Sequence, residues 1–117
     1  MIIGIGTDLV DIGRMTEAIA REAFVRRVFT VGEQEYCNRR GAHRSASYAA
    51  RFAAKEAVFK AFGTGLGQGS WQDVEIVSGP GGRPEARLSG HFADLARRMG
   101  VTEIFVSLSH AEAVASA

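Results

Sequence analysis

Apolar residues recur at helical spacing in the first part of the chain. Asp11 can cap a helix that runs to about Glu22, and its apolar stripe consists of Ile12, Met15 and Ile19. Two shorter helical segments are expected to follow, one carrying the apolar residues of 24–29 and one running from Thr30 to about Asn38. The pattern therefore predicts three helices before residue 40.

The longest predicted helix lies in the middle of the chain. A polar loop at residues 38–43 precedes it, Ser45 or Ser47 can cap it, and its pattern continues to about Phe62. Gly63 suits the left-handed conformation that commonly ends a helix. The glycine-rich run GTGLGQGS at 63–70 then predicts a flexible loop.

The remaining pattern predicts strands. Residues 1–7 are typical of a buried strand, in which Gly4 and Gly6 mark the close approach of another backbone or a ligand. After Trp71, the run DVEIV alternates so that residues 74 and 76 face inward, and the turn GPGGRP joins it to the strand EARLSG. An amphipathic helix at 91–99 and strands in TEIFVSLSH and EAVASA complete the pattern.

The predicted order of elements is β-α-α-α-β-β-α-β-β. Because hairpins outnumber crossovers in this order, it favours an α+β fold, with a largely antiparallel sheet and one long central helix. A chain of 117 residues, 46% of them hydrophobic, fits one domain spanning 1–117 whose modest core can depend on self-association for stability.

Charge is distributed unevenly along the chain. Residues 1–60 hold ten Lys and Arg against seven Asp and Glu, a net +3, whereas residues 61–117 hold four against six, a net −2. The basic half indicates an anionic partner. Nucleic acid is a poor candidate for it, because the overall charge is low and no interleaving of basic and aromatic residues is present.

Cysteine content and hydropathy bear on the compartment. Cys37 is the only cysteine, which excludes an intrachain disulfide and indicates a reducing environment, and the thiol is predicted to be inert. The N-terminal apolar run is short and has no basic flank, unlike a signal peptide, and no run is long enough to span a bilayer. We therefore expect a cytoplasmic protein with no membrane partner.

The segment RFAAKEAVFKAFGTG at 51–65 places Glu56 on the same helix sector as Phe52 and Phe59. One interpretation is an i, i+4 ion pair with Lys60 that stabilises the helix by a few tenths of a kcal/mol, roughly. The other is a ligand for a cation, because burying an unpaired carboxylate is costly. Both interpretations remain open on the pattern alone.

Asp8 is the natural second carboxylate, since it ends the first apolar run. Alternatively, it caps or bends the entry to the first helix. Two carboxylates from separate elements, near Lys60 and a glycine-rich loop, are typical of Mg²⁺ sites that also bind substrate phosphates, and such oxygen ligands accept Mn²⁺ as well. Neither glycine run matches the dinucleotide-binding or P-loop motifs.

Four segments, in this order, resemble those of the holo-acyl-carrier-protein synthases, the small 4′-phosphopantetheinyl transferases. They are GIGTDLVDIGRM, RFAAKEAVFKAFGTG, GGRPEARLSG and VSLSH, and the resemblance extends from residue 2 to about 110. It implies that the 4′-phosphopantetheine arm of coenzyme A passes to a serine of an apo acyl carrier protein, with release of adenosine 3′,5′-bisphosphate.

The same resemblance implies roles for individual residues. Asp8 and Glu56 would bind Mg²⁺ with the coenzyme A pyrophosphate, Glu56 would accept the serine proton directly or through water, and Lys60 would stabilise the leaving bisphosphate. Arg51 and His110 would face the nucleotide from the adjacent subunit, while Gly63, Arg83, Pro84 and Arg44 are further candidates for coenzyme A binding. From the residues alone, an ordinary strand-end histidine and solvated loop arginines explain His110, Arg83 and Arg44.

Partners are implied as well. The resemblance implies homotrimers with sites at the subunit boundaries. In the family the first helix meets the acidic carrier, which points to Arg14 and Arg21 as carrier-binding residues, extended by Arg26 and Arg27. A solvated helix face explains these arginines equally well. His43 and His91 have no predicted role. After His110 only AEAVASA follows, whereas relatives usually continue through a longer apolar strand. Either the end of that strand is absent from this sequence, or the final strand is short, in which case the packing at the subunit boundary and the placement of His110 differ from the family pattern. The competing hypotheses are a non-catalytic coenzyme A or nucleotide-binding scaffold and a self-associating structural domain.

Overall fold

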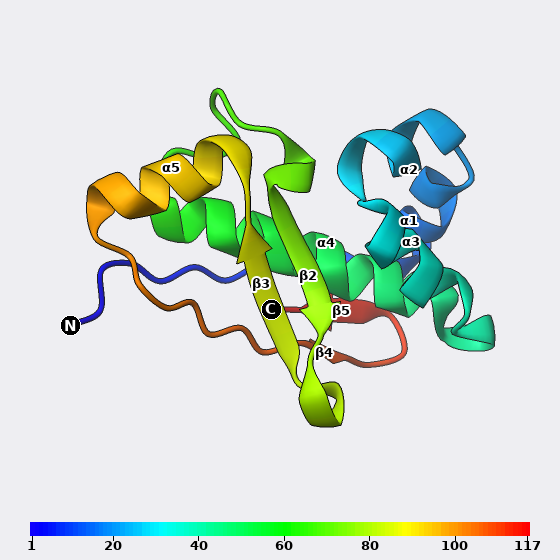
Figure 1. Cartoon of the computed structure of the whole chain (residues 1–117). Helices are drawn as coiled ribbons and strands as arrows, with labels where there is room; N and C mark the ends of the chain where they lie inside the picture. The colour runs from blue at the N-terminus through cyan, green and yellow to red at the C-terminus, as the bar shows by residue number, and fades with distance from the viewer.

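One long helix, α4 (Arg44–Phe62), lies at the centre of the molecule, and the other elements pack around it (Figure 1). The computed structural model describes all residues from 1 to 117. Before α4 come β1 (Leu9–Asp11), α1 (Ile12–Ile19), α2 (Glu22–Val28) and α3 (Val31–Asn38). After it come β2 (Val74–Ser78), β3 (Pro84–Leu88), α5 (Gly90–Met99), β4 (Ser109–His110) and β5 (Val114–Ser116).

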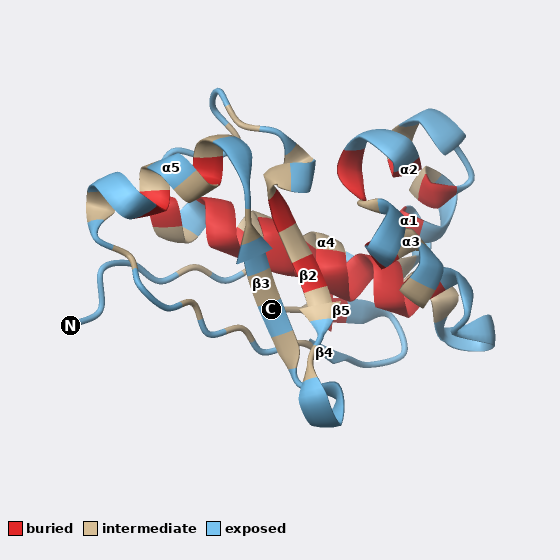
Figure 2. Cartoon of the chain, in the orientation of Figure 1, coloured by how far each residue is buried: buried red, intermediate tan, exposed pale blue.

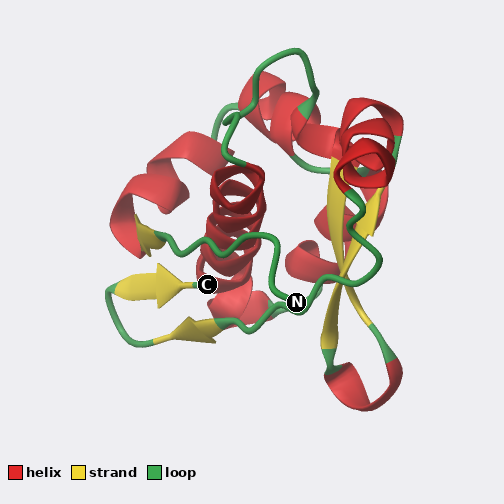
Figure 3. Cartoon of the chain, turned by 90° about the vertical axis from the view of Figure 1, so that its left-hand side faces the viewer, coloured by secondary structure: helices red, strands yellow, loops and turns green.

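The strands form two separate antiparallel sheets on different sides of α4 (Figure 3). In the larger sheet, β5 lies between β1 and β4, and Ala115 pairs with both Val10 and His110. The smaller sheet is the hairpin of β2 and β3, in which Val74 and Ile76 face the core as expected. The predicted α+β class and the antiparallel pairing are therefore confirmed, but the strands divide into two sheets where one was expected.

The core divides into two clusters along α4 (Figure 2). The helices α1, α2 and α3 pack on the first half of α4 around Phe29 and Tyr48, whose rings meet edge to face at a centroid distance of 4.8 Å. The hairpin and α5 pack on the second half around Phe59 and Phe92, whose rings stack at 4.8 Å. Trp71 contacts both clusters and joins them.

Most of the predicted helix ends are confirmed. The Asp11 side chain accepts a hydrogen bond from the backbone N–H of Arg14, and Thr30 forms a reciprocal capping box with Glu33 at the start of α3. Gly63 ends α4 in the left-handed conformation, with φ of 81°. The first helix ends earlier than predicted, at Ile19, because the chain turns there into α2.

The predicted N-cap of α4 is wrong. Ser45 and Ser47 both lie inside the helix, which begins at Arg44 without a side-chain cap. A turn of 3-10 helix at Gly41–His43 leads directly into α4. This turn supplies the first helical geometry, so the helix does not need a serine to start it.

Two of the predicted strands are also wrong over most of their length. Residues 1–7 are largely exposed, and neither they nor residues 102–108 make a backbone hydrogen bond to another segment. The two segments adjoin β1 and β4, which lie on either side of β5. Because β5 ends at Ser116, it pairs with β1 and β4 but not with the segments themselves. A strand needs a neighbour, and the local pattern cannot supply one.

The expected close approach at the N-terminal glycines is confirmed. A Cβ added to Gly4 would lie 2.2 Å from the carbonyl oxygen of Ala61, and one added to Gly6 would lie 2.0 Å from that of Ala57. Both partners are backbone atoms of α4, so neither can move aside cheaply. The two glycines therefore allow the N-terminal segment to lie directly on the central helix.

An apolar groove of about 900 Å³ lies between the N-terminal segment and residues 99–107, with Ala57 and Ala61 of α4 at its base. Large apolar side chains on its walls are exposed, among them Ile2, Ile5 and Phe105. A contiguous exposed apolar surface of this kind is typical of a contact with another molecule. None of the helices combines the length and apolar character needed to cross a membrane.

Candidate active site

Asp8, Glu56 and Lys60, here named the carboxylate corner, come together where the chain enters β1 beside α4. The backbone of Asp8 pairs with Ala117 through hydrogen bonds of 3.0 and 3.1 Å, which fixes its position at the edge of the larger sheet. Lys60, from the last turns of α4, donates through Nζ to Asp8 Oδ1 at 2.9 Å and to the carbonyl of Thr7 at 3.0 Å. Lys60 thus pairs with Asp8, and the ion pair between Lys60 and Glu56, one of the two interpretations of the pattern, does not form.

The two carboxylates of this corner repel each other. Partial burial is the main cause that raises the pKa of Glu56, and the negative charge of Asp8 raises it further, while Lys60 acts in the opposite direction. The pKa of Lys60 is raised, chiefly by its hydrogen bond to Asp8. No group of three or more His, Cys, Asp or Glu side chains that could hold a metal ion is present, so the corner offers a cation two carboxylates.

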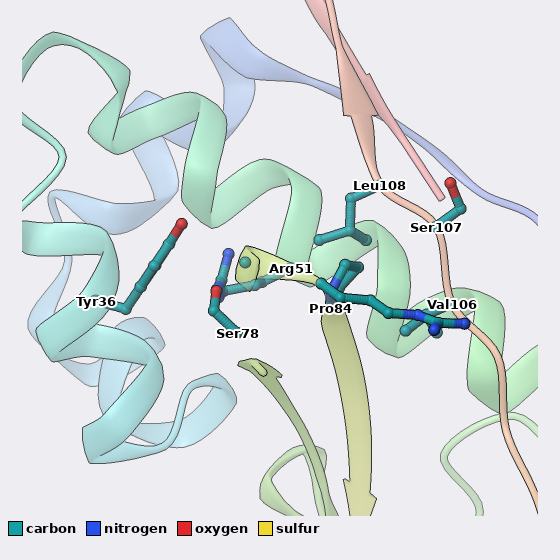
Figure 4. Close-up of a pocket in the computed structure, with 9 residues that line it drawn as sticks. Tyr36, Arg51, Ser78, Pro84, Val106, Ser107 and Leu108 are labelled. Carbon is teal, nitrogen blue, oxygen red and sulfur yellow. The ribbon is translucent and has the colours of Figure 1, made fainter. Parts of the chain in front are cut away.

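A second region, here named the arginine pocket, lies between α3, α4 and the β2–β3 hairpin (Figure 4). Its volume is about 410 Å³. Its lining consists of Tyr36, Arg51, Ser78, Gly82, Arg83, Pro84 and residues 106–108. Three predicted coenzyme A residues, namely Arg51, Arg83 and Pro84, therefore share one cavity, although Arg51 lies more than 30 residues before the other two in the sequence.

Arg51 is a buried cation without an acidic partner. The residue is only 4% exposed, and it takes part in none of the ion pairs of the molecule. Two of its nitrogens approach the hydroxyl groups of Ser47 and Ser78, at 3.5 and 3.3 Å, and its Nε has no hydrogen-bond partner. A buried positive charge that is left uncompensated attracts an anion into the adjoining cavity.

The field of the pocket also acts on Tyr36. A hydrogen bond with Ser78 is the main cause that lowers the pKa of Tyr36, and the positive charges of Arg40 and Arg51 lower it further, against the effect of burial. The surroundings thus favour a negatively charged group at this position.

A buried ion pair links the elements that carry the two regions. Lys55, next to Glu56 on α4, lies 2.8 Å from Glu33 of α3, and neither side chain is exposed. Lys55 also donates to the carbonyls of Trp71 and Val74, while Glu33 accepts from the backbone N–H of Ile76. All polar atoms of the pair are satisfied, so it ties α3, α4 and β2 into one unit.

The other predicted residues lie outside these two regions. Gly63 is exposed at the end of α4, and Arg44 donates through Nε to Asn38 at 2.9 Å and lies over the ring of Tyr48. His110 is exposed in β4, with its ring centroid 6.1 Å from that of His43. The predicted carrier-binding arginines are all exposed on or between α1 and α2: Arg14, Arg21, Arg26 and Arg27.

Sequence reasoning missed Tyr36, Ser78 and Glu33, and it assigned no role to His43. A signal for the first three was available in the helical wheel. Arg51 and Lys55 share a sector with Val58 and Phe62, so the wheel places two cations beside apolar side chains, where each needs a partner. The identity of those partners depends on tertiary contacts, which the wheel does not give.

The carboxylate corner and the arginine pocket are separate. Arg51 and Glu56 are five residues apart on α4, which turns their side chains roughly 140° from one another around the helix. None of the three corner residues lines the pocket. A single chain therefore presents the two predicted parts of a coenzyme A site on different sides of the same helix.

The chain is similar to known proteins over nearly its whole length. Residues 4–115 match the model of the 4′-phosphopantetheinyl transferase superfamily. The chain is 53% identical over 114 residues to the holo-[acyl-carrier-protein] synthase of Moorella thermoacetica, an alignment that covers 96% of this chain and 88% of the relative.

Solved structures agree with this result. The holo-[acyl-carrier-protein] synthase of Neisseria meningitidis superposes with a TM-score of 0.89 at 32% identity, covering 99% of this chain and 94% of that one. The enzyme of the same name from Helicobacter pylori, solved in complex with coenzyme A, superposes with a TM-score of 0.83 at 30% identity, covering 96% and 94%. The chain therefore belongs to the 4′-phosphopantetheinyl transferase superfamily and, within it, to the holo-[acyl-carrier-protein] synthases.

Proposed function

We propose that this protein transfers the 4′-phosphopantetheine arm of coenzyme A to a serine of an apo acyl carrier protein and releases adenosine 3′,5′-bisphosphate. The observation that carries the proposal is the meeting of Asp8, Glu56 and Lys60 at one corner, in a chain 53% identical to a holo-[acyl-carrier-protein] synthase. The whole chain, residues 1–117, acts in this proposal as one transferase domain.

The carboxylate corner fits a divalent cation. Asp8 and Glu56 offer hard oxygen ligands. Burial raises the pKa of Glu56 most and repulsion from Asp8 raises it further, and a cation between the two carboxylates relieves that repulsion. We propose Mg²⁺, with Mn²⁺ as a substitute, because Mg²⁺ binds through one or two carboxylates together with substrate phosphates. When bound, the ion supplies charge neutralisation at the diphosphate of coenzyme A.

The residues of the chain then divide the work of the transfer. The serine oxygen attacks the phosphorus that carries the pantetheine arm, and the bond from that phosphorus to the bisphosphate breaks. Glu56 accepts the serine proton, directly or through water, and its partly buried carboxylate makes it a stronger base than an exposed glutamate. The ammonium of Lys60 stabilises the negative charge of the leaving bisphosphate.

The nucleotide end of coenzyme A is assigned to the arginine pocket. Arg51 provides a buried cation, and Arg83 and Pro84 line the same cavity. Because the pocket and the corner lie on different sides of α4, we propose that the pocket of one subunit completes the corner of the next. His110 and Gly63 are further contacts of this shared site, and Arg44, which is engaged with Asn38, would need to turn toward it.

A homotrimer is the proposed assembly, since a closed ring is the usual product of head-to-tail contacts. The apolar groove supports it, because Ile2, Ile5 and Phe105 would leave water in a subunit contact. The exposed arginines of α1 and α2, from Arg14 to Arg27, form the proposed docking surface for the acidic carrier. The free thiol of Cys37 suits the reducing cytoplasm expected for this reaction.

The proposal is tested by incubating the protein with coenzyme A, MgCl₂ and an apo acyl carrier protein, and measuring the mass of the carrier. We expect the mass to rise by one phosphopantetheine group, with no change for a carrier whose acceptor serine is replaced by alanine. Removal of divalent cations with EDTA should stop the reaction, and added Mg²⁺ should restore it. Binding of coenzyme A without any transfer, unaltered in Glu56→Gln, would instead identify a non-catalytic coenzyme A-binding scaffold.

A further inference from the structure

The guanidinium of Arg51 is held without a carboxylate, although it is almost fully buried. Its hydroxyl neighbours, Ser47 and Ser78, lie at 3.5 and 3.3 Å, distances typical of weak hydrogen bonds. No acid forms an ion pair with it. Some other group must therefore define the orientation of this cation and lower the cost of its burial.

Tyr36 is that group. The central carbon of the Arg51 guanidinium lies 4.0 Å from the centroid of the Tyr36 ring, the shortest of the cation–π contacts in the molecule. Arg40, which is exposed, also lies over this ring, at 5.5 Å. Figure 4 shows Tyr36 beside Arg51 and Ser78 at one end of the pocket, while Pro84 and residues 106–108 form the other end.

The difference between an aromatic and an acidic partner matters for ligand binding. A carboxylate at this position would neutralise Arg51 and would repel an incoming phosphate. The face of a tyrosine ring attracts the guanidinium through its quadrupole, by about 0.5 to 2 kcal/mol, and carries no net charge. The positive charge of Arg51 thus stays available to an anion.

We infer that Tyr36 is a positioning residue, which holds the guanidinium of Arg51 against its ring so that this buried cation binds a phosphate group in the arginine pocket. The inference rests on the proposed function for the nature of that anion, a phosphate of coenzyme A. The lowered pKa of Tyr36, to which Ser78 contributes most and the charges of Arg40 and Arg51 contribute further, fits a site whose field favours negative charge.

The test compares three replacements of Tyr36 in the full-length protein. The measurements are the dissociation constant for adenosine 3′,5′-bisphosphate by calorimetry, and kcat and KM for coenzyme A. Tyr36→Leu removes the ring. We expect the dissociation constant for the bisphosphate and KM for coenzyme A each to rise about 5- to 20-fold, while kcat stays within twofold. Tyr36→Phe keeps the ring face and should bind within about threefold of the wild type.

Tyr36→Glu separates positioning from packing. A glutamate can still hold Arg51, but by an ion pair that consumes its charge, so we expect weaker bisphosphate binding than in Tyr36→Leu. A purely structural role for the ring predicts lower thermal midpoints for both variants and the same dissociation constant as the wild type for whatever protein stays folded. Arg40→Gln, which removes the exposed cation on the same ring, is the matched control and should change affinity by less than about threefold.

Two results would overturn the inference: a folded Tyr36→Leu protein that binds the bisphosphate as the wild type does, or a Tyr36→Glu protein that binds it as well as Tyr36→Phe. If Tyr36→Leu does not fold, the comparison of the Glu and Phe variants decides. Failure of the proposed function looks different, because Arg51→Gln would then leave coenzyme A and bisphosphate binding unchanged.

Discussion

The carboxylate corner and the arginine pocket hold charge in opposite ways. In the corner, two acids lie near one cation, Lys60, which pairs with Asp8 and whose side chain is 53% exposed. In the pocket, one cation has no acid at all, and the residue as a whole is 4% exposed. The corner carries an excess of negative charge near water, whereas the pocket carries an excess of positive charge inside the protein.

This difference indicates what each region is able to bind. Exposed ion pairs contribute little to stability, so the contact of Lys60 with Asp8 can be exchanged at low cost for a contact with a metal ion or a phosphate. A buried unpaired cation is costly to keep and cannot reorganise easily, so it suits an anion that always arrives in the same position. The corner is thus adaptable and suited to reaction chemistry, and the pocket is rigid and suited to binding.

The largest effect is expected from the corner. Asp8→Asn or Glu56→Gln should lower the turnover of carrier modification by about 10³-fold or more, because each removes a proposed metal ligand and the second also removes the proposed base. The measurement is the time course of the carrier mass shift at saturating Mg²⁺. Glu35→Gln, which changes an exposed carboxylate on α3, is the matched control and should be nearly as active as the wild type. Activity within tenfold of the wild type in both corner variants would contradict these roles.

The next largest effect is expected on stability, from the buried Lys55–Glu33 ion pair that links the elements of both regions. Lys55→Met leaves the Glu33 carboxylate buried without a cation and should lower the free energy of unfolding by about 3 to 5 kcal/mol. Urea denaturation followed by circular dichroism measures it. The double variant Lys55→Met with Glu33→Gln contains no unpaired charge and should recover part of the loss. A double variant no more stable than Lys55→Met alone would show that the charge of Glu33 is not the cause.

Breaking the pocket should separate binding from catalysis. Arg51→Gln removes the buried cation, and since a charge-assisted hydrogen bond contributes about 1.5 to 3 kcal/mol, KM for coenzyme A should rise roughly 10- to 100-fold. The value of kcat should change much less, because the corner residues remain in place. Steady-state kinetics with varied coenzyme A gives both constants. A variant that loses kcat while it keeps KM would place Arg51 in the chemical step and erase the contrast between the two regions.

The sequence predicts the helices better than the strands, for a physical reason. The ends of α1, α3 and α4 are set by Asp11, Thr30 and Gly63, whose contacts lie within a few residues of each helix end. Residues 1–7 and 102–108 have the composition of strands, but a strand forms only against a partner, and the strand between them ends at Ser116. That pairing is not encoded locally.

The candidate site shows the same division. Asp8, Glu56 and Lys60 could be predicted together, because the spacing of Glu56 and Lys60 is helical and Asp8 ends the first apolar run. The environment of Arg51 could not be predicted, since Tyr36 comes from α3 and Ser78 from β2, and neither lies in a segment with a distinctive pattern. Local spacing identifies the residues of a site, and tertiary packing decides their partners.

The smallest effect tests the repulsion inside the corner through its dependence on pH. The pKa of Glu56 is raised above its ordinary value of 4.5, so between these two values the folded protein binds more protons than the unfolded chain. Its stability therefore falls as pH rises through that window. Glu56→Gln lacks this group. With EDTA present, the free energy of unfolding of Glu56→Gln minus that of the wild type should therefore increase from pH 4 upward and then level off.

Asp8→Asn sharpens this measurement, because it removes the charge that adds to the effect of burial on Glu56. In that background the growth of the difference with pH should be smaller but still present, since burial is the larger cause. A stability difference between the wild type and Glu56→Gln that does not change with pH would show that Glu56 titrates as an exposed glutamate. The corner would then hold no excess negative charge for a cation to relieve, and the contrast with the arginine pocket would rest on Arg51 alone.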